Sequence, residues 1–517
     1  MSDTIHRRRW AILAVLCLSL LMVIVDNTIV NVALPTLSAD LDASITELQW
    51  VVDAYTLVFA ALLLAFGHFG DRFGRKIALQ LGLVIFAATS ALAALATSVP
   101  QLVGARALMG IGAALVFPAT LAILVNVFTD KRERAAAIGI WSAMTGAAVA
   151  LGPVVGGYLL EHFSWGSIFL VNLPIAAVAL IAGWFLVPNS SDPNTGAPDH
   201  LGLVLSAAGV GLVVWSIIEA PHRGWTSAII VVAGLAGVAL LCAFALWERR
   251  SAHPLLDVTL FRNLRFTAAS VSVTTAFFAL FGFIFLITQY LQLVQGYSPL
   301  EAGIRTLPFA IATGLTSPLA IVLMHRLGTK VVVSAGLMVM AIGFVMASFN
   351  EVDTPYFGLT ITSMVTIAIG LGRTTGPATE SIMGALPSDK AGVGSAVNDT
   401  TRELGGTLGV AVVGSVFASV YGAAMLSALK DTGLPQAVVE TAEQSIAAGL
   451  AVAQGLPADL AADVTAAAQQ SFVDGLGAGS LVAGAVAAIG SVVALVLLPA
   501  RHAAPAVPSE PAMVDAV

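Results

Sequence analysis

Long apolar stretches separated by short polar segments run along almost the whole chain. A helix that crosses a bilayer needs about 20 mostly apolar residues, and the pattern provides about fourteen such stretches. They lie at approximately 11–33, 48–66, 77–97, 101–128, 135–159, 167–187, 201–219, 227–247, 267–294, 302–324, 331–349, 357–379, 393–420 and 479–498. The pattern therefore predicts an all-α integral membrane protein with 14 transmembrane helices.

The composition excludes several other classes of protein. Hydrophobic residues make up 58% of the chain and charged residues only 10%, which is incompatible with a soluble fold. The net charge of −7 is small for 517 residues and gives no information about nucleic acid, which we do not expect as a partner. Cys17 and Cys242 both lie inside predicted helices, so we expect neither a disulfide framework nor a metal site, and no cofactor.

The positive charges indicate an orientation. With the N-terminus inside, the outer segments hold only Arg223 and Lys430. The inner segments hold Arg7, Arg8, Arg9, Arg72, Arg75, Lys76, Lys131, Arg132, Arg134, Arg249, Arg250, Arg262, Arg265, Arg326, Lys330, Lys390 and Arg501. This bias predicts that both termini are cytoplasmic in a multi-pass protein of a bacterial cytoplasmic membrane. Twelve helices would fit the same parity, but the two apolar runs between 201 and 247 favour fourteen.

The predicted helices fall into two groups of six around an extra pair. The expected parts are a cytoplasmic N-terminus (1–10), a first six-helix bundle (11–187), a linker with two extra helices (188–266), a second bundle (267–498) and a cytoplasmic tail (499–517). DRFGRK at 71–76 and HRLGTK at 325–330 each follow the second helix of a bundle, a weak repeat typical of secondary transporters.

An acidic outer segment, 421–477, interrupts the second bundle. Its Ala-rich runs, broken by Pro457, predict a short helical hairpin. It is either a solvated cap or an acidic rim that concentrates cations.

Four motifs carry more specific information. In GHFGDRFGRK at 67–76, we expect Gly67 and Gly74 to allow a tight turn. We expect Asp71 to accept hydrogen bonds at a helix N-terminus and to pair with an arginine across the interface between the bundles. The other three motifs are VDNTIVNVALP at 25–35, LVGARALMGIGAA at 102–114 and LGPVVGG at 151–157.

Together these motifs resemble the major facilitator superfamily and, within it, the fourteen-helix drug:proton antiporters of the EmrB/QacA type. The resemblance implies two six-helix bundles plus two extra helices, alternating access and a monomer. It implies that Asp71, with Gly67, Arg72, Gly74 and Arg75, latches the outward-facing state. It also implies a proton-transfer role for Arg106, and gating by Gly152, Pro153, Gly156 and Gly157 in the fifth helix. QWVVDAY at 49–55, with Asp53, looks closest to the quaternary-ammonium exporters.

Two acidic residues, Asp26 and Asp53, lie inside predicted helices. A charge near a helix centre costs roughly 2.5–3.5 kcal/mol, so such residues tend to be functional. Both lie about 8 Å below the outer face by helix rise. We expect the two carboxylates to share one layer of a central cavity and to hold either a proton or a cationic drug. The alternative is that each hydrogen-bonds a neighbouring helix.

Further charged residues lie in later helices. Asp399, Arg402 and Glu403 share one helix and form either a proton or substrate site or a self-neutralising cluster. Glu380 is on the same helix face as Arg373 and has either a role in proton or substrate binding or a structural role. Arg106 has no carboxylate within one turn, so we expect its partner on another helix.

Aromatic residues are candidates for a substrate surface. Phe277, Phe281 and Phe285 form a stripe that either stacks on a lipophilic cation or packs the protein. Trp50 and Tyr55 flank Asp53 and belong either to the outer aromatic belt or to the cavity wall.

No phosphate-binding GxxxxGK[ST], HExxH or GxSxG motif occurs, so we expect neither ATP as the driver nor an enzyme. The sequence predicts a proton-coupled multidrug efflux antiporter whose partners are lipophilic, cationic small molecules, protons and the lipid bilayer. One alternative is a proton-coupled exporter of a neutral or anionic metabolite or self-made antibiotic, with Arg106, Arg373 or Arg402 meeting the substrate. The other is a receptor or scaffold that does not transport.

Overall fold

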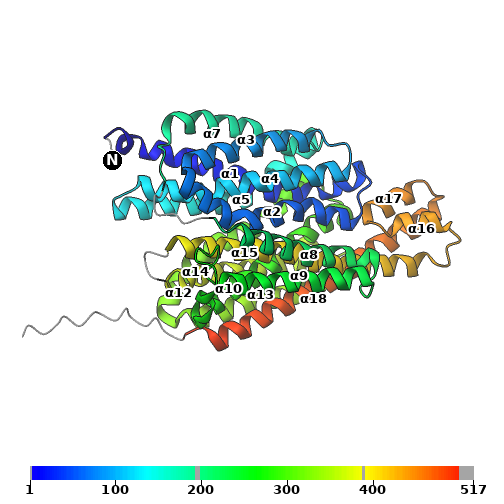
Figure 1. The fold of residues 1–517 in the computed structure, drawn as a ribbon. Helices are drawn as coiled ribbons and strands as arrows, with labels where there is room; N and C mark the ends of the chain where they lie inside the picture. Colours follow the sequence, from blue (N-terminus) through cyan, green and yellow to red (C-terminus); the bar gives the residue numbers. More distant parts are fainter. Residues whose placement is uncertain (1–2, 192–197, 387–390, 500–517) are drawn as a thin grey trace, which may run out of the picture.

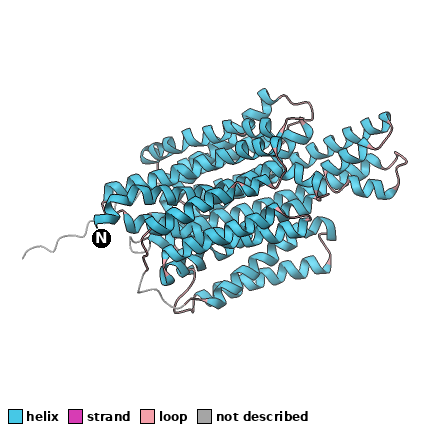
Figure 2. Cartoon of the chain, turned by 90° about the horizontal axis from the view of Figure 1, so that it is seen from above, coloured by secondary structure: helices cyan, strands magenta, loops and turns pink. Residues whose placement is uncertain are grey.

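The structure, a computed structural model, describes residues 3–191, 198–386 and 391–499. In these residues, fourteen helices are long and apolar enough to cross a membrane, and the predicted all-α membrane fold is confirmed. Figure 2 shows these helices running side by side along one direction. Lys390, Arg501 and almost all of the predicted tail lie outside the described residues.

The first six spans and the extra pair follow one another closely along the chain. They are α1 (Asp3–Asp40), α2 (Ile45–Phe73), α3 (Arg75–Ala94), α4 (Val99–Val127), α5 (Lys131–His162), α6 (Ser167–Leu170) with α7 (Asn172–Leu186), α8 (His200–Arg223) and α9 (Ala228–Glu248). Short polar caps define several starts. Ser44 and Glu47 form a capping box at α2, and the Asp130 carboxylate accepts from two backbone amides at α5.

The second half contains the remaining six spans and three short helices, η1, α16 and α17. Its elements are η1 (Val258–Arg262), α10 (Leu264–Gln289), the π-helical η2 (Tyr290–Val294) and η3 (Tyr356–Thr360), α11 (Pro299–Arg305), α12 (Leu307–Leu327), α13 (Thr329–Ala347), α14 (Ile361–Met383), α15 (Ala391–Leu429), α16 (Gln436–Ala442), α17 (Ile446–Gln454) and α18 (Ala458–Leu497). A second capping box, Ser298 with Glu301, starts α11.

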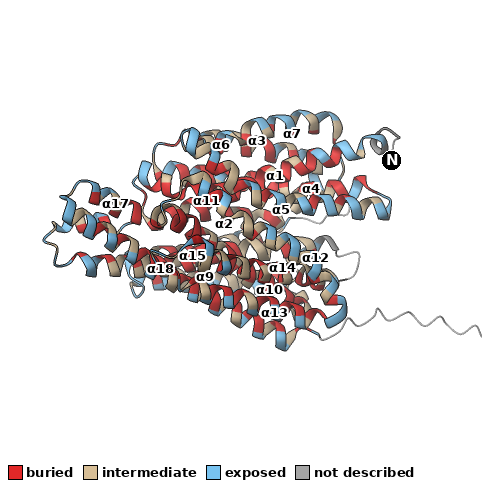
Figure 3. Cartoon of the chain, turned by 180° about the vertical axis from the view of Figure 1, so that it is seen from behind, coloured by how far each residue is buried: buried red, intermediate tan, exposed pale blue. Residues whose placement is uncertain are grey.

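The molecule has two distinct ends (Figure 1). We call the end that carries α16 and α17 the cap end, and the opposite end, where α1 begins and α18 finishes, the terminal end. Helices α1–α7 form one bundle and α10–α15 with α18 form the other, and Figure 3 shows buried residues concentrated inside and between them. Large exposed side chains such as Trp184, Phe185, Val232 and Leu235 cover the outside, as a lipid-facing surface requires.

The cap consists of α16 and α17 between lengthened ends of α15 and α18. Helix α18 begins at Ala458, directly after Pro457 and well before the predicted start at 479. The cap also contacts the first bundle, because the Ile45 amide donates to the Gln444 carbonyl (3.0 Å). The hydroxyls of Ser38 and Ser445 lie 3.1 Å apart. The cap therefore joins the two bundles at this end.

The turn between α2 and α3 differs from the prediction. Helix α2 continues through Gly67 to Phe73, so the expected turn at Gly67 is wrong. Gly74 alone makes the turn, with a φ of 121°. Gly328, at the matching place between α12 and α13, has a φ of 85°, so both copies of the weak repeat turn on a glycine in a conformation that other residues avoid.

We predict that Gly74→Ala lowers the melting temperature of the purified protein. A side chain at this φ costs about 1–2 kcal/mol, and the added Cβ would lie 2.7 Å from Asn189 Oδ1. Gly104→Ala in α4 is the matched control, because nothing lies within 4 Å of its added Cβ. A Gly74→Ala protein that melts at or above the wild-type temperature would contradict this role of the glycine.

Candidate transport site

The charge pair of Asp26 and Arg106 lies in the interior of the first bundle. Arg106 Nη1 donates to Asp26 Oδ2 at 2.5 Å, and both side chains are 0% exposed. Asn172 Nδ2 donates to the other Asp26 oxygen at 2.8 Å. The Arg106 guanidinium also lies over the Tyr55 ring, 4.3 Å from its centroid. Arg106 therefore has the expected partner on another helix, Asp26. Asp26 in turn hydrogen-bonds neighbouring helices, as the structural interpretation of this residue predicted.

Asp53 has a different environment although it is also fully buried. Its Oδ1 accepts a long hydrogen bond from Thr56 Oγ1 (3.4 Å), and its Oδ2 has no hydrogen-bond partner among the described residues. Thr407 of α15 donates to Thr56 Oγ1 (3.1 Å) and lies within 3.0 Å of the Glu403 carbonyl. Asp53 therefore faces the other bundle.

The contact surface between α2 and α15, here called the seam, is unusually polar for a membrane interior. Gln49 Nε2 lies 3.1 Å from the carbonyls of both Val410 and Ala411. Gly414 makes room for this side chain, because a Cβ there would lie 2.6 Å from Gln49 Nε2. The seam thus joins the bundles through hydrogen bonds as well as apolar packing.

The three charged residues of α15 make few direct contacts with one another in the described residues. Arg402 Nη2 donates to Thr379 Oγ1 (3.2 Å), and its guanidinium lies 5.3 Å from the Phe277 ring centroid. It forms no ion pair with Asp399 or Glu403 in this part of the chain. Arg402 Nε and Glu403 Oε2 are both buried without a hydrogen-bond partner there. Glu403, like Asp53, therefore has a buried carboxylate oxygen without a hydrogen-bond partner among the described residues.

Glu380, another predicted site residue, lies on α14. It is partly buried and sits one turn before Met383, where α14 ends towards the terminal end.

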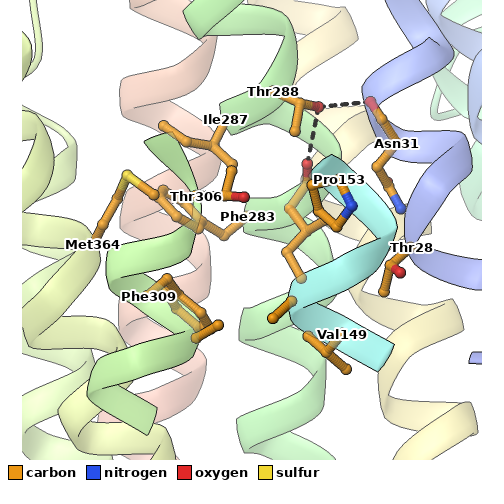
Figure 4. A pocket seen from close by; sticks show the side chains of 13 residues that line it. Thr28, Asn31, Val149, Pro153, Phe283, Ile287, Thr288, Thr306, Phe309 and Met364 are labelled. Carbon is orange, nitrogen blue, oxygen red and sulfur yellow. Dashed lines mark hydrogen bonds between the residues drawn. The ribbon is translucent and has the colours of Figure 1, made fainter. Parts of the chain in front are cut away.

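A pocket lies between the two bundles (Figure 4), and the space of about 530 Å³ within it that protein atoms do not fill includes open solvent. Its labelled lining residues are Thr28, Asn31, Val149, Pro153, Phe283, Ile287, Thr288, Thr306, Phe309 and Met364. None of the lining residues is charged. Thr288 Oγ1 donates to the Asn31 carbonyl (2.7 Å) and so connects α10 of one bundle with α1 of the other.

The two carboxylates that we expect to share one layer of a central cavity are not part of this pocket. One residue turns an α-helix by about 100°. Asp26 therefore points about 200° away from Thr28, which lines the pocket. Asp53 and Tyr55 likewise point to opposite sides of α2. Neither Asp26 nor Asp53 lines the pocket.

The aromatic expectations also need correction. Phe277, Phe281 and Phe285 do not line the pocket, which takes Phe283 from the opposite face of α10. Phe285 is fully buried, and Phe277 lies beside Arg402.

The two aromatic residues near Asp53 each contact a charged side chain. Tyr55 is buried under Arg106, and Trp50 Nε1 donates to Glu219 Oε1 of α8 (3.1 Å). The sequence interpretation overlooked Glu219, although its i,i+4 spacing to Arg223 was a detectable signal.

The glycine motif of α5 closes the cap end. Gly152 and Gly156 pack against α1, where an added Cβ would overlap Thr28 or Ile29. Gly157 packs against α11, because its added Cβ would lie 2.5 Å from the Pro299 carbonyl oxygen. Pro153, within the same motif, contacts Gly303 of α11. Close approach of backbones at small residues is typical of helix packing in membranes.

The halves of α5 and α12 nearer the terminal end are packed less tightly. Among the described residues, no atom lies within 4 Å of a Cβ added at Gly139 or Gly146 of α5, or at Gly314 of α12. The bundles therefore pack tightly towards the cap end and lack this packing towards the terminal end.

The Asp71 motif lies at the terminal end. Asp71 is in the last turn of α2, so the expected position at a helix N-terminus is wrong. Its carboxylate pairs with Arg75 at 2.8 Å, four residues along the same segment, and not with an arginine of the other bundle. Arg72 is exposed and lies 5.6 Å from the Phe73 ring centroid.

Comparison with known proteins agrees with this architecture. The Major Facilitator Superfamily profile matches residues 16–410. The chain belongs to the Major Facilitator Superfamily. It is 39% identical over 476 residues to the multidrug efflux pump LfrA of Mycolicibacterium smegmatis, covering 92% of this chain and 94% of that protein.

Two further relatives of this superfamily member are resistance proteins. The methyl viologen resistance protein SmvA of Salmonella typhimurium is 34% identical over 470 residues, covering 90% of this chain and 93% of that one. The tetracenomycin C resistance and export protein of Streptomyces glaucescens is 32% identical over 499 residues, covering 94% and 91%. The chain is therefore a small-molecule transporter of a bacterial cytoplasmic membrane and not an enzyme.

Solved structures share the superfamily fold at low sequence identity. A bacterial homologue of the human lysosomal transporter Spinster superposes with a TM-score of 0.64 at 18% identity, covering 96% of this chain and 98% of that one. A D-xylose–proton symporter superposes with a TM-score of 0.61 at 15% identity, covering 95% and 98%.

We predict a non-additive effect on stability when the buried charge pair is broken. Removing one partner of such a pair costs roughly 3–5 kcal/mol because the other charge stays buried. Arg106→Met should therefore lower the melting temperature more than the double substitution Asp26→Asn with Arg106→Met does. Thermal unfolding of the purified variants measures this. A double variant less stable than Arg106→Met would show that an unpaired Asp26 charge does not destabilise the protein.

Proposed function

We propose that this protein is a proton-coupled multidrug efflux antiporter that exports lipophilic, cationic compounds by alternating access. The observation that carries the proposal is Asp53, a fully buried carboxylate at the seam whose Oδ2 has no hydrogen-bond partner among the described residues. An unpaired charge in such surroundings is costly. A proton on Asp53, or a cation near it, removes this cost, and an antiporter exchanges these two ligands.

The seam supports coupling between charge and conformation. Close polar contacts form a path across the seam: Thr56 Oγ1 lies 3.4 Å from Asp53 Oδ1 and 3.1 Å from Thr407 Oγ1, which lies 3.0 Å from the Glu403 carbonyl. Because this path crosses from one bundle to the other, any movement of α2 against α15 changes the surroundings of both carboxylates. Protonation of Asp53 and Glu403 therefore alters the relative free energies of the conformations in which α2 and α15 are in contact or apart.

The orientation follows from the charge distribution. The bias of Lys and Arg towards the terminal end supports a cytoplasmic terminal end and an external cap end. With tight packing at the cap end, the described conformation then faces inward. The pairing of Asp71 within its own segment fits this state, because the resemblance assigns its cross-bundle latch to the outward-facing state.

The pocket supports a lipophilic substrate. Its lining is apolar apart from a few hydroxyl and amide groups, and Phe283 and Phe309 offer aromatic surface. Cationic substrates are supported by Asp53 and by SmvA, whose name records resistance to methyl viologen, a dication. On this proposal the charge of the substrate is balanced by a carboxylate outside the pocket wall.

Export of a neutral or anionic metabolite or antibiotic is the second candidate. The pocket favours it because no lining residue is charged, so nothing in its wall selects a cation. The tetracenomycin C export protein is a relative with a substrate of this broader kind.

We predict that Asp53→Asn abolishes proton-driven accumulation of a fluorescent divalent cation in inverted vesicles with an imposed pH gradient. The amide cannot exchange a proton for a cation, so uptake should fall at least about tenfold, which corresponds to roughly 1.4 kcal/mol. A monovalent cation is measured in parallel and should be affected less. Asp431→Asn, at an exposed carboxylate in the cap, is the matched control and should leave uptake unchanged.

Two results would contradict this proposal. Unchanged uptake in Asp53→Asn would remove Asp53 from the mechanism. Wild-type vesicles that move neither cation but move a neutral antibiotic with proton exchange would favour the second candidate.

A further inference from the structure

The extra helix α8 lies directly over the seam. It packs against α2 of the first bundle and α15 of the second, whereas α9 packs mainly against α8. In Figure 1, α8 lies alongside α15. Helix α8 is therefore placed to influence how α2 and α15 move relative to each other, which a helix facing only lipid could not do.

Polar contacts fix α8 to both sides of the seam. Trp50 of α2 donates its indole N–H to Glu219 Oε1 (3.1 Å). Ser415 of α15 donates to the Ile217 carbonyl (2.8 Å). Trp225, just after α8, donates to Ser419 Oγ of α15 (3.2 Å). These contacts all lie in the half of α8 nearer the cap end.

Apolar packing lies beneath these contacts. Val214 and Ile218 of α8 are fully buried against Ala411 of α15, with Trp50 packed at the edge. The carboxylate of Glu219 is only 15% exposed and also accepts from Arg223 Nε (2.8 Å). Glu219 thus has two donors that hold its side chain in place for Trp50.

Trp50 connects this arrangement to Asp53. The two residues are three apart on α2, so they lie on neighbouring positions of one helix face. Gln49, on the same face, donates to the carbonyls of α15. Holding Trp50 therefore holds the helix turn that carries Asp53 against α15.

We propose that α8 fastens the cap-end half of the seam, and that Glu219 is a positioning residue that acts on Asp53 through Trp50. The inference rests on the alternating access of the proposed function. The Glu219–Trp50 hydrogen bond stabilises the state in which the cap end is closed, and it breaks when the cap end opens.

The test measures the separation of the bundles at the cap end directly. Spin labels are placed at Thr97→Cys, in the turn between α3 and α4, and at Glu351→Cys, between α13 and η3, both of which are exposed. The background carries Cys17→Ala and Cys242→Ala. Pulsed electron paramagnetic resonance then gives the populations of short and long label distances.

Removing either partner should open the cap end. Glu219→Leu and Trp50→Phe should each raise the ratio of long to short distances about three- to tenfold, the effect of losing one buried hydrogen bond. The double variant should open it no further than a single variant does. Glu219→Gln keeps an acceptor for the indole and should restore the wild-type distribution. Trp184→Phe, at an exposed indole of α7, is the matched control and should change nothing.

Several outcomes would overturn the inference. These are unchanged distances in Glu219→Leu and Trp50→Phe, additive effects in the double variant, or a Glu219→Gln distribution that matches that of Glu219→Leu. A failure of the proposed function looks different. If the wild type keeps one distance at every pH and substrate concentration while Glu219→Leu lengthens it, the fastening stands and alternating access fails.

Discussion

A carboxylate between transmembrane helices must be paired, protonated or close to a cation, because water does not solvate its charge there. Asp26 is paired with Arg106 and with Asn172, so its charge belongs to the fixed interior of the first bundle. Asp53 and Glu403 each retain a buried oxygen without a partner in the described residues. On the proposed function, the protonation of these two carboxylates therefore depends on the position of α2 relative to α15.

On the proposed function, the pocket that binds the substrate and the carboxylates that exchange protons lie in different parts of the molecule. The pocket between the bundles is uncharged and apolar, whereas the titratable groups lie at the seam. The glycines of α5, the cap and the contacts of α8 all hold the bundles together towards the cap end. On the proposed function, this division allows one pocket to accept compounds of varied shape while the two seam carboxylates couple transport to the proton gradient.

The sequence predicted the number and approximate positions of the spans because lipid requires a long apolar run for each helix. It also predicted that Arg106 has a partner on another helix. It could not choose that partner, since the pairing with Asp26 depends on how α1 and α4 pack. Helix geometry alone places Asp26 and Thr28 on opposite sides of α1, and Asp53 and Tyr55 on opposite sides of α2. The pocket residues Phe309 and Met364, and the contact of Trp50 with Glu219, arise from tertiary packing that no local pattern encodes.

The most direct test of the central claim is to count protons released when a monovalent fluorescent cation binds to the purified protein in weakly buffered detergent solution near neutral pH. If a buried carboxylate holds either a proton or the cation, binding releases protons, and the affinity for the cation rises as the pH is raised. Binding with no proton release, and with an affinity that does not change with pH, would contradict the account.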